Sequence, residues 1–394
     1  MFEKLQPAPP DKILALMAQY REDGRADKID LGVGVYKDEQ GETPVMRSIR
    51  EAEKRLYEEQ TTKSYVGLQG DKAFCAVMGA LVLGDAVPNE RLRVCQSLGG
   101  SGALSIIAMM INRARPNATV WLSDPSWPNH IPLLSGAGLK PQSYPYYDAA
   151  TGAILFEEMM AALQGAKAGD IVLLHGCCHN PTGADLTLEQ WAAVADLCAE
   201  KGLFPFIDLA YQGFGDGLEE DVAGVRLMAQ KVPELAIAAS CSKNFAVYRE
   251  RAGSAILVSN DAGALDNAFS QLLSVKRSVY SMPPDHGGAI VRIVLEDAEL
   301  RADWMEELET MRNRMVTLRR DFADALRRAS NSERFDFIAE QKGMFSRLGL
   351  TTEQIDTLRN DYGIYIVGDS RINIAGLHHD KLDDLARAIV AVAG

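Results

Sequence analysis

The chain has 394 residues, of which 47% are hydrophobic and 24% are charged, a composition typical of a soluble globular protein. Its 41 Lys and Arg residues against 54 Asp and Glu residues give a formal net charge of −13, which argues against binding to a nucleic-acid backbone. No stretch approaches the roughly 18 uninterrupted apolar residues of a membrane helix, and the N-terminus lacks a secretory-signal pattern. We therefore expect a cytoplasmic protein of two domains, with no nucleic-acid or membrane partner.

The first elements in chain order are an arm and two helices. The stretch QPAPPD predicts an extended N-terminal arm over residues 1–11, and Asp11 is placed to cap a helix through KILALMAQY. A second helix is expected from about Pro44 through RSIREAEKRLYEEQ.

Short apolar runs then alternate with helical patterns. RLRVCQSL precedes SGALSIIAMMINRAR, TVWLSD precedes NHIPLLSGAG, and DIVLLHGC precedes LTLEQWAAVADLCAEKG. Further strands are predicted for FPFIDLAY, ELAIAAS and AGSAILVS. Strands that are apolar throughout and alternate with helices predict an α/β fold, with a mostly parallel sheet covered by helices on both faces.

The C-terminal part predicts a smaller α+β unit. Residues from roughly 285 to 330 are expected to form one long amphipathic helix. FDFIAEQKGMFSRLGL and YIVGDSRINIAGL follow, with helices between and after them.

The six cysteines, at positions 75, 95, 177, 178, 198 and 241, do not form a disulfide framework and are expected to be small buried apolar residues. The cluster of His175, Cys177, Cys178 and His179 looks metal-binding at first sight. It contains no C-x₂-C pair, and no second group of ligands is visible elsewhere, so we expect no metal.

Polar residues gather where predicted strands end. The glycine-rich turn GGSGAL (99–104) opens an apolar helix and suits a phosphate, although such turns also simply begin helices. Asp208 ends the strand FPFID, with Tyr211 shortly after it, and could either meet a cation or cap the next turn. Asn180 lies in the turn HNPTGA, a pattern that is more often structural than functional.

Lys243 ends the apolar strand ELAIAAS, and Arg251 follows it. A desolvated lysine loses its preference for the charged form and becomes a nucleophile or base. Ser240 and Lys243 also fit the S-x-x-K pattern of acyl transfer, but its companion motifs S-D-N and K-T-G do not occur in the chain. A lysine, a strand-end aspartate and a phosphate turn with serines and an arginine together meet the needs of pyridoxal phosphate.

In their order along the chain, LGVGVYKDE, SYVGLQG, GGSGAL, DPSWPNH, HGCCHNPTGA, DLAYQGF, SCSKNF, YSMPP and SRINIAGL resemble the class I pyridoxal-phosphate aminotransferases. The resemblance covers essentially the whole chain and is to the aspartate and aromatic-amino-acid (tyrosine) subgroup. It implies a fold type I transferase with an arm of residues 1–11. A large cofactor-binding domain would span residues 46–309, and a small domain would combine residues 12–45 with 310–394.

The resemblance also implies roles around the cofactor. Lys243 would bind it as a Schiff base and, once displaced by substrate, carry the proton in catalysis. Asp208 would keep the pyridinium nitrogen protonated. Tyr211 and Asn180 would form hydrogen bonds to the 3′ oxygen of the cofactor, and Trp127 would stack on its ring.

Further residues would support the cofactor from around it. His130 and His175 would orient Asp208, although both could equally be satisfied core histidines. The phosphate would be held by Gly100, Ser101, Ser240, Ser242, Arg251 and, from a partner subunit, Tyr65. Gly99 stands where some relatives have a serine, so one hydroxyl contact is expected to be missing.

For the substrate, the resemblance implies that Arg371 clamps the α-carboxylate and that Gly34 lies where the backbone closes over it, with Trp127 and Asn180 nearby. Arg277, before YSMPP, would bind a side-chain carboxylate in the neighbouring subunit. Each active site would then need two chains, which makes the working unit a homodimer.

We therefore expect an aminotransferase that uses pyridoxal phosphate and moves an amino group between aromatic amino acids or aspartate and 2-oxoglutarate by a ping-pong route. A strict aspartate aminotransferase is the close alternative. A lyase or decarboxylase on the same fold is disfavoured because it has less need of Arg277 together with Arg371. A binding module without activity would be expected to have lost Lys243 or Asp208.

Overall fold

The computed structural model describes residues 1–7 and 12–394, and the expected extension of residues 8–11 and the cap by Asp11 lie outside these residues. After a 3₁₀ turn at Phe2–Lys4, helix α1 spans Lys12–Glu22 and α2 spans Arg47–Glu59, so both predicted N-terminal helices are present. The second begins three residues later than Pro44, where the expectation placed it.

A seven-stranded sheet forms the centre of the molecule, in the order β2-β8-β7-β6-β5-β3-β4. Only β8 runs antiparallel to its neighbours, which confirms the prediction of a mostly parallel sheet. The strands are β2 (Leu92–Leu98), β3 (Thr119–Asp124), β4 (Lys140–Pro145), β5 (Ile171–His175), β6 (Phe204–Leu209), β7 (Glu234–Ser240) and β8 (Ala252–Ser259).

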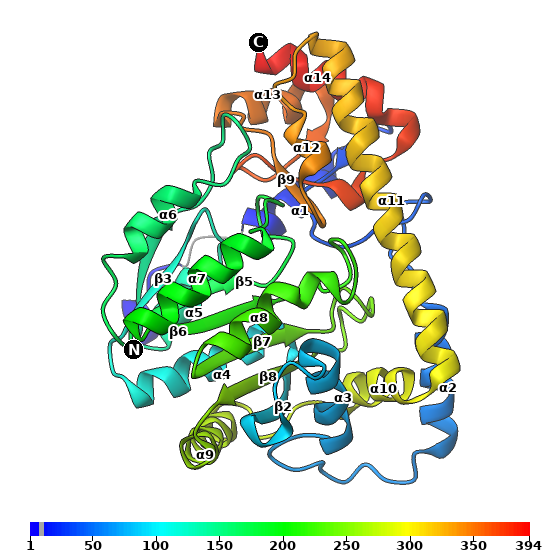
Figure 1. The fold of residues 1–394 in the computed structure, drawn as a ribbon. Helices are drawn as coiled ribbons and strands as arrows, with labels where there is room; N and C mark the ends of the chain where they lie inside the picture. The colour runs from blue at the N-terminus through cyan, green and yellow to red at the C-terminus, as the bar shows by residue number, and fades with distance from the viewer. Residues whose placement is uncertain (8–11) are drawn as a thin grey trace.

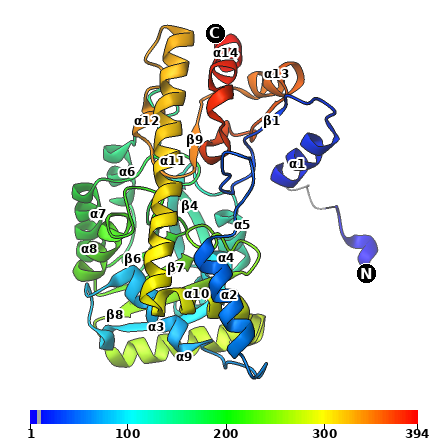
Figure 2. The same ribbon diagram turned by 90° about the vertical axis from the view of Figure 1, so that its right-hand side faces the viewer.

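Helices cover both faces of this sheet, as Figures 1 and 2 show. Because successive side chains of a strand point to opposite faces, Val172 and Leu173 of β5 belong to two separate apolar clusters. One cluster contains α3 (Lys72–Leu83), α7 (Leu188–Lys201) and α8 (Ala223–Lys231), and the other contains α4 (Gly99–Ala114), α5 (His130–Gly136) and α9 (Ala262–Val279). The strands are apolar on both faces for this reason.

The prediction of one helix from 285 to 330 was wrong. The structure has two helices, α10 (Asp285–Glu296) and α11 (Ala298–Ser330), separated by Asp297. Asp297 has an extended backbone, and its carboxylate accepts hydrogen bonds from the N–H groups of Glu299 and Leu300 at 3.0 Å each. An aspartate that caps a new helix in this way ends the preceding one.

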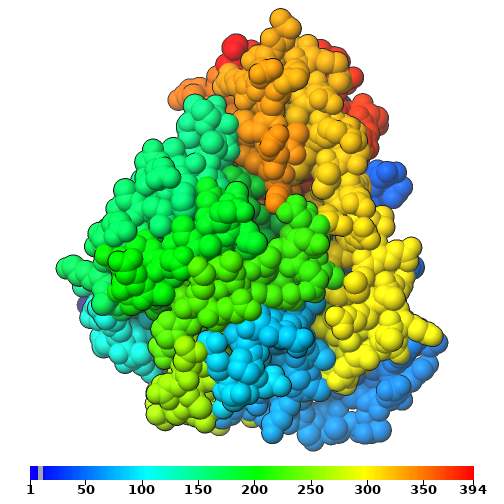
Figure 3. Space-filling view, in the orientation of Figure 1, coloured from blue at the N-terminus to red at the C-terminus, as the bar shows by residue number. Residues whose placement is uncertain are grey.

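A third apolar cluster lies at the other end of α11. It joins Leu31 to α11, α12 (Phe337–Glu340), α13 (Thr352–Tyr362) and α14 (Leu382–Ala393). Two small sheets accompany it: β9 (Phe345–Arg347) pairs with β11 (Arg371–Asn373), and β1 (Ile29–Asp30) pairs with β10 (Ile364–Tyr365). In Figure 1 this C-terminal part lies above the main sheet, and α11 runs along one side of both. The space-filling view shows the same part in orange and red above the green and cyan segments (Figure 3). The domain boundaries at residues 45 and 309 stay a prediction.

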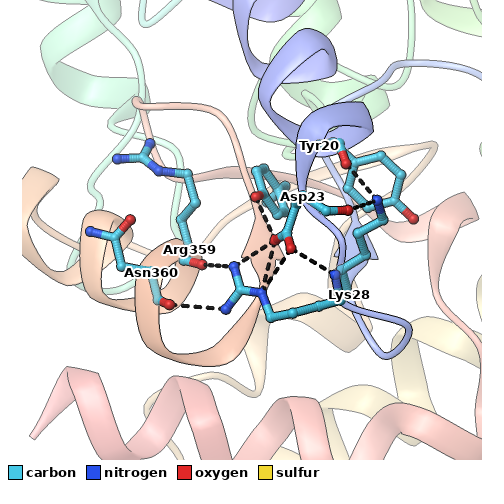
Figure 4. A network of polar contacts seen from close by, with 7 residues as sticks. Tyr20, Asp23, Lys28, Arg359 and Asn360 are labelled. Atoms are coloured by element: carbon cyan, nitrogen blue, oxygen red, sulfur yellow. Dashed lines mark hydrogen bonds and ion pairs between the residues drawn. The ribbon is translucent and has the colours of Figure 1, made fainter.

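A polar network fixes the chain after α1 to the C-terminal part (Figure 4). The Arg25 guanidinium pairs with Asp23 and donates to the carbonyls of Arg359 and Asn360 at 2.8 and 2.9 Å. The hydroxyl of Tyr365 donates to the same carboxylate at 2.7 Å, and these contacts lower the pKa of Asp23. Helix α1 is thereby held near the end of α13.

All six cysteines are buried and unpaired, as predicted. None of the helices within residues 1–7 and 12–394 combines the length and the apolar content that crossing a bilayer requires.

The loop after β6 is organised around the buried carboxylate of Asp221. Its two oxygens accept four backbone N–H groups, from Gly213, Gly215, Asp216 and Gly217. Burial raises the pKa of Asp221, while these donors oppose that shift. This one side chain therefore closes the loop that begins at Tyr211.

Replacing Asp221 with alanine is expected to destabilise the protein by about 3 kcal/mol, because buried N–H groups lose their acceptors. The Asp221→Asn variant keeps one oxygen and should lose about half as much. Thermal unfolding measured by calorimetry checks this, and a midpoint for Asp221→Ala within 1 °C of wild type would contradict it.

Candidate active site

A cavity of about 270 Å³ opens at the carboxyl ends of β5, β6 and β7, where Asp208 and Ser240 lie at or near the strand ends. Open parallel sheets place ligand sites at this edge. The other wall comes from the C-terminal part through Phe345 and Arg371. Most residues predicted for one site line this cavity: Gly34, Gly100, Ser101, Trp127, Asn180, Asp208, Tyr211, Ser240, Ser242, Lys243, Arg251 and Arg371.

The amine of Lys243 projects from the turn after β7 and lies 4.8 Å from the centre of the Tyr211 ring. Burial lowers the pKa of Lys243 to about 8, opposed by the Asp208 carboxylate and assisted by the positive charge of Arg251. About a tenth of the amine is therefore unprotonated at pH 7, far more than for an ordinary lysine of pKa about 10.4, which suits a nucleophile or a base.

The Asp208 carboxylate accepts a hydrogen bond from Nε2 of His130 at 3.0 Å. Burial by itself would raise the pKa of Asp208, but this hydrogen bond and the charge of Lys243 outweigh it and hold the pKa below its usual value. The expected alternative, a cap on the following turn, does not account for this contact. Asp208 is a buried anion that faces the cavity.

A chain of hydrogen bonds leads to Asp208, and in each of them the group farther from Asp208 is the donor. The backbone N–H of Asn180 donates to Nδ1 of His175 at 3.4 Å, and burial lowers the pKa of His175 to about 3, so this ring is neutral. Its Nε2–H therefore donates to the hydroxyl of Ser126 at 3.2 Å, which in turn donates to Nδ1 of His130 at 2.9 Å. Both predicted histidines lie behind Asp208, and Ser126, which the sequence did not single out, joins them.

The first turn of α4 has the features of an anion site. Its N-cap, Leu98, provides no side-chain hydrogen bond, and the N–H of Gly99 donates to the carbonyl of Arg251 at 2.8 Å. The next N–H groups of the helix, from Gly100 on, are left to a ligand. Arg251 lies beside this turn and donates to the hydroxyl of Ser242 at 3.2 Å. Gly99 has φ +61°, and a Cβ there would lie 2.8 Å from Nη2 of Arg251. The arginine thus fills the place where a serine side chain at position 99 would project.

Arg371 is a buried cation whose guanidinium donates only to neutral acceptors. Its Nη1 donates to Oδ1 of Asn180 at 3.2 Å and its Nη2 to the carbonyl of Gly32 at 3.1 Å, while its buried Nε has no partner. No ion pair of Arg371 occurs among the described residues. A buried guanidinium with free donors suits a carboxylate ligand.

Phe345 is a cavity residue that the sequence did not reveal. Its ring lies 4.3 Å from the Arg371 guanidinium and packs edge-on against Tyr211 at 6.0 Å. A Cβ at Gly34 would lie 2.9 Å from this ring, which explains the glycine. An aromatic residue in a short strand carries no local signal of function, so only the fold could place it. Ile13, Leu104, Cys177, Ala210 and Tyr248 also line the cavity without having been predicted.

Two predicted residues do not line the cavity of their own chain. Tyr65 is 87% exposed, and Arg277, in the last turn of α9, is exposed and donates to the hydroxyl of Ser281. Their predicted roles concern a neighbouring subunit and are not tested by a single chain.

The expectation that no second group of ligands accompanies Cys177 and Cys178 missed one carboxylate. The fold brings a carboxylate oxygen of Asp221 within 4.8 Å of both sulfur atoms. These residues are distant in the sequence, so spacing could not reveal the contact. Both oxygens of Asp221 already accept backbone N–H groups, as described above.

The profile of the family "Aminotransferase class I and II" matches residues 26–389. The aromatic-amino-acid aminotransferase of Paracoccus denitrificans is 53% identical over 392 residues, and the aspartate aminotransferase of Salmonella typhi is 47% identical over 395 residues, each match covering 100% of both chains. The solved structure of an aromatic-amino-acid aminotransferase from Burkholderia pseudomallei, covalently bound to pyridoxal phosphate, has a TM-score of 0.96 at 43% identity and covers 100% of both chains.

The amine of Lys243 should titrate with a midpoint near pH 8 in protein stripped of bound small molecules, against about 10.4 for an ordinary lysine. In Asp208→Asn the midpoint should fall further, because the lost carboxylate charge favoured the ammonium form. Trace acetylation across a pH series, read by peptide mass spectrometry, measures this midpoint.

The Asp221→Asn variant is the matched control, since it removes a buried carboxylate that is not among the charges acting on Lys243. A wild-type midpoint above pH 10, or equal shifts in the two variants, would contradict the assignment.

Proposed function

The chain belongs to the class I and II aminotransferases, and on that basis we propose that it exchanges amino groups between aromatic amino acids or aspartate and 2-oxoglutarate, using pyridoxal phosphate. The fold is that of the fold type I transferases, as predicted. The observation that carries the proposal is the placement of the Lys243 amine beside Asp208, in a cavity that also holds the buried Arg371. Single-turnover spectroscopy, described below, tests it.

The residues present fit this cofactor. The uncapped N-terminus of α4 at Gly100 and Ser101, together with Ser240, Ser242 and Arg251, would hold the phosphate. Lys243 would bind the carbonyl carbon covalently, and Asp208 would hold the ring nitrogen. When bound, the cofactor withdraws electrons from the substrate and makes its α-proton acidic.

Lys243 is the group that moves the proton in this proposal. Its Nζ accepts the proton from the α-carbon of the substrate and later returns one, which is favourable because its pKa lies near working pH. Asp208 stays ionised, supported by His130, and stabilises the positive charge on the ring nitrogen. The chain from Asn180 through His175 and Ser126 fixes the ring of His130 in the donating form.

Three side chains orient the cofactor ring. Burial raises the pKa of Tyr211, so its phenol stays protonated and can donate to the 3′ oxygen, together with the amide of Asn180. Trp127 lines the same cavity and offers an aromatic face for stacking. These positions support the roles proposed for the three residues.

Arg371 would bind the α-carboxylate of the substrate. It is held in place by Asn180 and the carbonyl of Gly32, and its free donors satisfy a carboxylate in the fork geometry that guanidinium groups provide. Gly34 leaves room for the substrate against Phe345. Trp127 and Asn180 would lie beside the bound substrate.

The working unit would be a homodimer. Tyr65 and Arg277 are exposed, and neither lines its own chain's cavity, although both belong to motifs that resemble the family. We assign them to the partner's site, Tyr65 to the phosphate and Arg277 to the side-chain carboxylate of a dicarboxylic substrate. A cytoplasmic location stays a prediction from the sequence.

A strict aspartate aminotransferase is the second candidate. It is favoured by the 47% identity to an aspartate aminotransferase over the full length of both chains. The higher identity, 53%, to an aromatic-amino-acid aminotransferase supports the broader specificity.

Single-turnover conversion of the cofactor to its amino form, followed by absorbance, separates these candidates. We expect phenylalanine and aspartate to convert the loaded enzyme at rates within about tenfold of each other, a difference of about 1.4 kcal/mol in activation free energy. Rapid conversion by aspartate alone would establish the strict enzyme, and conversion by neither would overturn the aminotransferase assignment.

Substitutions of Arg277 and Arg371 should differ in their effects on kcat/KM for the two substrates. Arg277→Leu is expected to lower kcat/KM for aspartate by about 10- to 100-fold, the loss of hydrogen bonds to one carboxylate, and to change kcat/KM for phenylalanine little. Arg371→Leu should lower both by at least that factor, since every amino acid has an α-carboxylate.

Steady-state kinetics with both substrates measures these effects. Arg301→Leu, an exposed arginine of α11, is the control for the loss of one positive charge. Equal losses for the two substrates in Arg277→Leu would exclude a role in binding the side-chain carboxylate.

A further inference from the structure

Strand β2 is the first strand in the order of the main sheet and pairs with β8 on one side. An edge strand has outward N–H and C=O groups that need partners from elsewhere. At Gln96 the N–H donates to the carbonyl of Gln69 at 2.9 Å, and the carbonyl accepts from the amine of Lys276 at 2.6 Å. Two distant segments of the chain thus attach to one residue of β2.

The side chain of Gln96 repeats this pattern. Its Oε1 accepts from the N–H of Asp71 at 3.0 Å, and its Nε2 donates to the carbonyl of Pro284 at 3.0 Å. The main chain and the side chain of Gln96 therefore each bind the segment around residues 69–71 and the segment around residues 276–284. We call Gln96 with these four partners the Gln96 junction.

The junction is buried and tightly packed. Gln96 and Lys276 are both 0% exposed. A Cβ at Gly70 would lie 2.4 Å from Cβ of Gln96, and a Cβ at Gly288 would lie 2.4 Å from its Nε2. The turn at Gly70 and helix α10 at Gly288 approach so closely because each presents a glycine to the glutamine.

Lys276 has no carboxylate partner at the junction. Burial lowers its pKa, and its hydrogen bond goes to the carbonyl of Gln96. Its own carbonyl accepts from the N–H groups of Tyr280 and Ser281 at 3.1 and 3.0 Å, and Ser281 is the residue that Arg277 contacts. The end of α9 that presents Arg277 is therefore fixed to β2 through Lys276.

The segment on the other side presents Tyr65. From Gly67 to Asp71 the chain turns tightly, with the N–H of Gly70 bonded to the carbonyl of Gly67 at 3.1 Å. Asp71 then caps α3 and forms an ion pair with Arg292 of α10. The junction holds this turn, which begins two residues after Tyr65, and the side chain of Tyr65 is almost fully exposed.

From these contacts we propose that Gln96, with Lys276, is a positioning residue that sets Tyr65 and Arg277 at their places in the active site of the partner subunit. The inference rests on the proposed function, which assigns those two residues to the partner's site. Gln96 lies on the strand that ends at the chain's own phosphate turn, yet its contacts act on the neighbouring site. Substitution of Gln96 therefore impairs the other subunit's chemistry more than that of its own.

Hybrid dimers with one live site test this directly. In each hybrid the live site, meaning the one catalytically active site, belongs to the chain that keeps Lys243, because Lys243→Ala inactivates the active site of the other chain. In the remote hybrid, Gln96→Met is combined with Lys243→Ala in one chain, opposite a wild-type chain. In the local hybrid, Gln96→Met is in the chain with the live site, opposite a Lys243→Ala chain. The two hybrids carry the same substitutions.

We expect the remote hybrid to show a KM for aspartate about tenfold above that of the local hybrid, the effect of misplacing one hydrogen bond to a charged group. The KM for phenylalanine should rise less, and affinity for pyridoxal phosphate should fall in the remote hybrid through Tyr65. A residue needed only for folding would impair both hybrids equally, and that result would overturn the inference.

Arg277→Leu placed in the same two arrangements separates this inference from the proposed function. If Arg277→Leu shows no difference between remote and local hybrids, the shared active site itself is wrong. If it shows the difference and Gln96→Met does not, only the role of Gln96 is wrong.

A second variant keeps the test decisive if Gln96→Met fails to dimerise. Lys276→Met retains the side-chain contacts of Gln96 with Asp71 and Pro284 and removes only the hydrogen bond beside Arg277. It should raise the KM for aspartate in the remote hybrid and leave the affinity for pyridoxal phosphate unchanged. Unchanged KM in that hybrid would overturn the inference.

Discussion

The electrostatic interaction between a buried carboxylate and a buried amine, those of Asp208 and Lys243, is the constraint on which the rest of the site depends. Each charge would be costly to bury by itself. Asp208 opposes the fall in the pKa of Lys243, and Lys243 helps to hold Asp208 ionised. The strands that deliver them, β6 and β7, are neighbours and parallel, so both groups emerge at the same edge of the sheet.

The surrounding polar groups serve these two charges and the ligands they imply. The histidines and Ser126 behind Asp208 form one directional hydrogen-bond chain, because burial keeps His175 neutral. Arg371 arrives from the C-terminal part, where a separate apolar cluster supports its strand. The cavity thus lies where the carboxyl ends of the main sheet meet the C-terminal part, and both contribute residues to its wall.

Much of the fold could be predicted because its signals are local. Fully apolar strands that alternate with helices predicted the mostly parallel sheet, and the glycine turn that opens α4 predicted an anion site. The prediction of one helix from 285 to 330 was wrong because the hydrophobic periodicity does not show the break at Asp297. The capping carboxylate of Asp297 and its extended backbone decide that break. Phe345 and Ser126 carried no signal of their own, and the approach of Asp221 to two cysteines joins residues far apart in the sequence.

The sequence by itself determined the chemistry: a strand-end lysine, an aspartate, a phosphate turn and two arginines in an order that resembles one family. Only the tertiary structure decided how those groups act, because pKa values and hydrogen-bond direction depend on burial and on neighbours distant along the chain. The pKa of Lys243 is lowered to about 8 because the folded sheet buries the amine, with Asp208 opposing this shift and Arg251 assisting it. The position of Gln96 between two distant segments likewise follows from the edge of β2, which no linear pattern reveals.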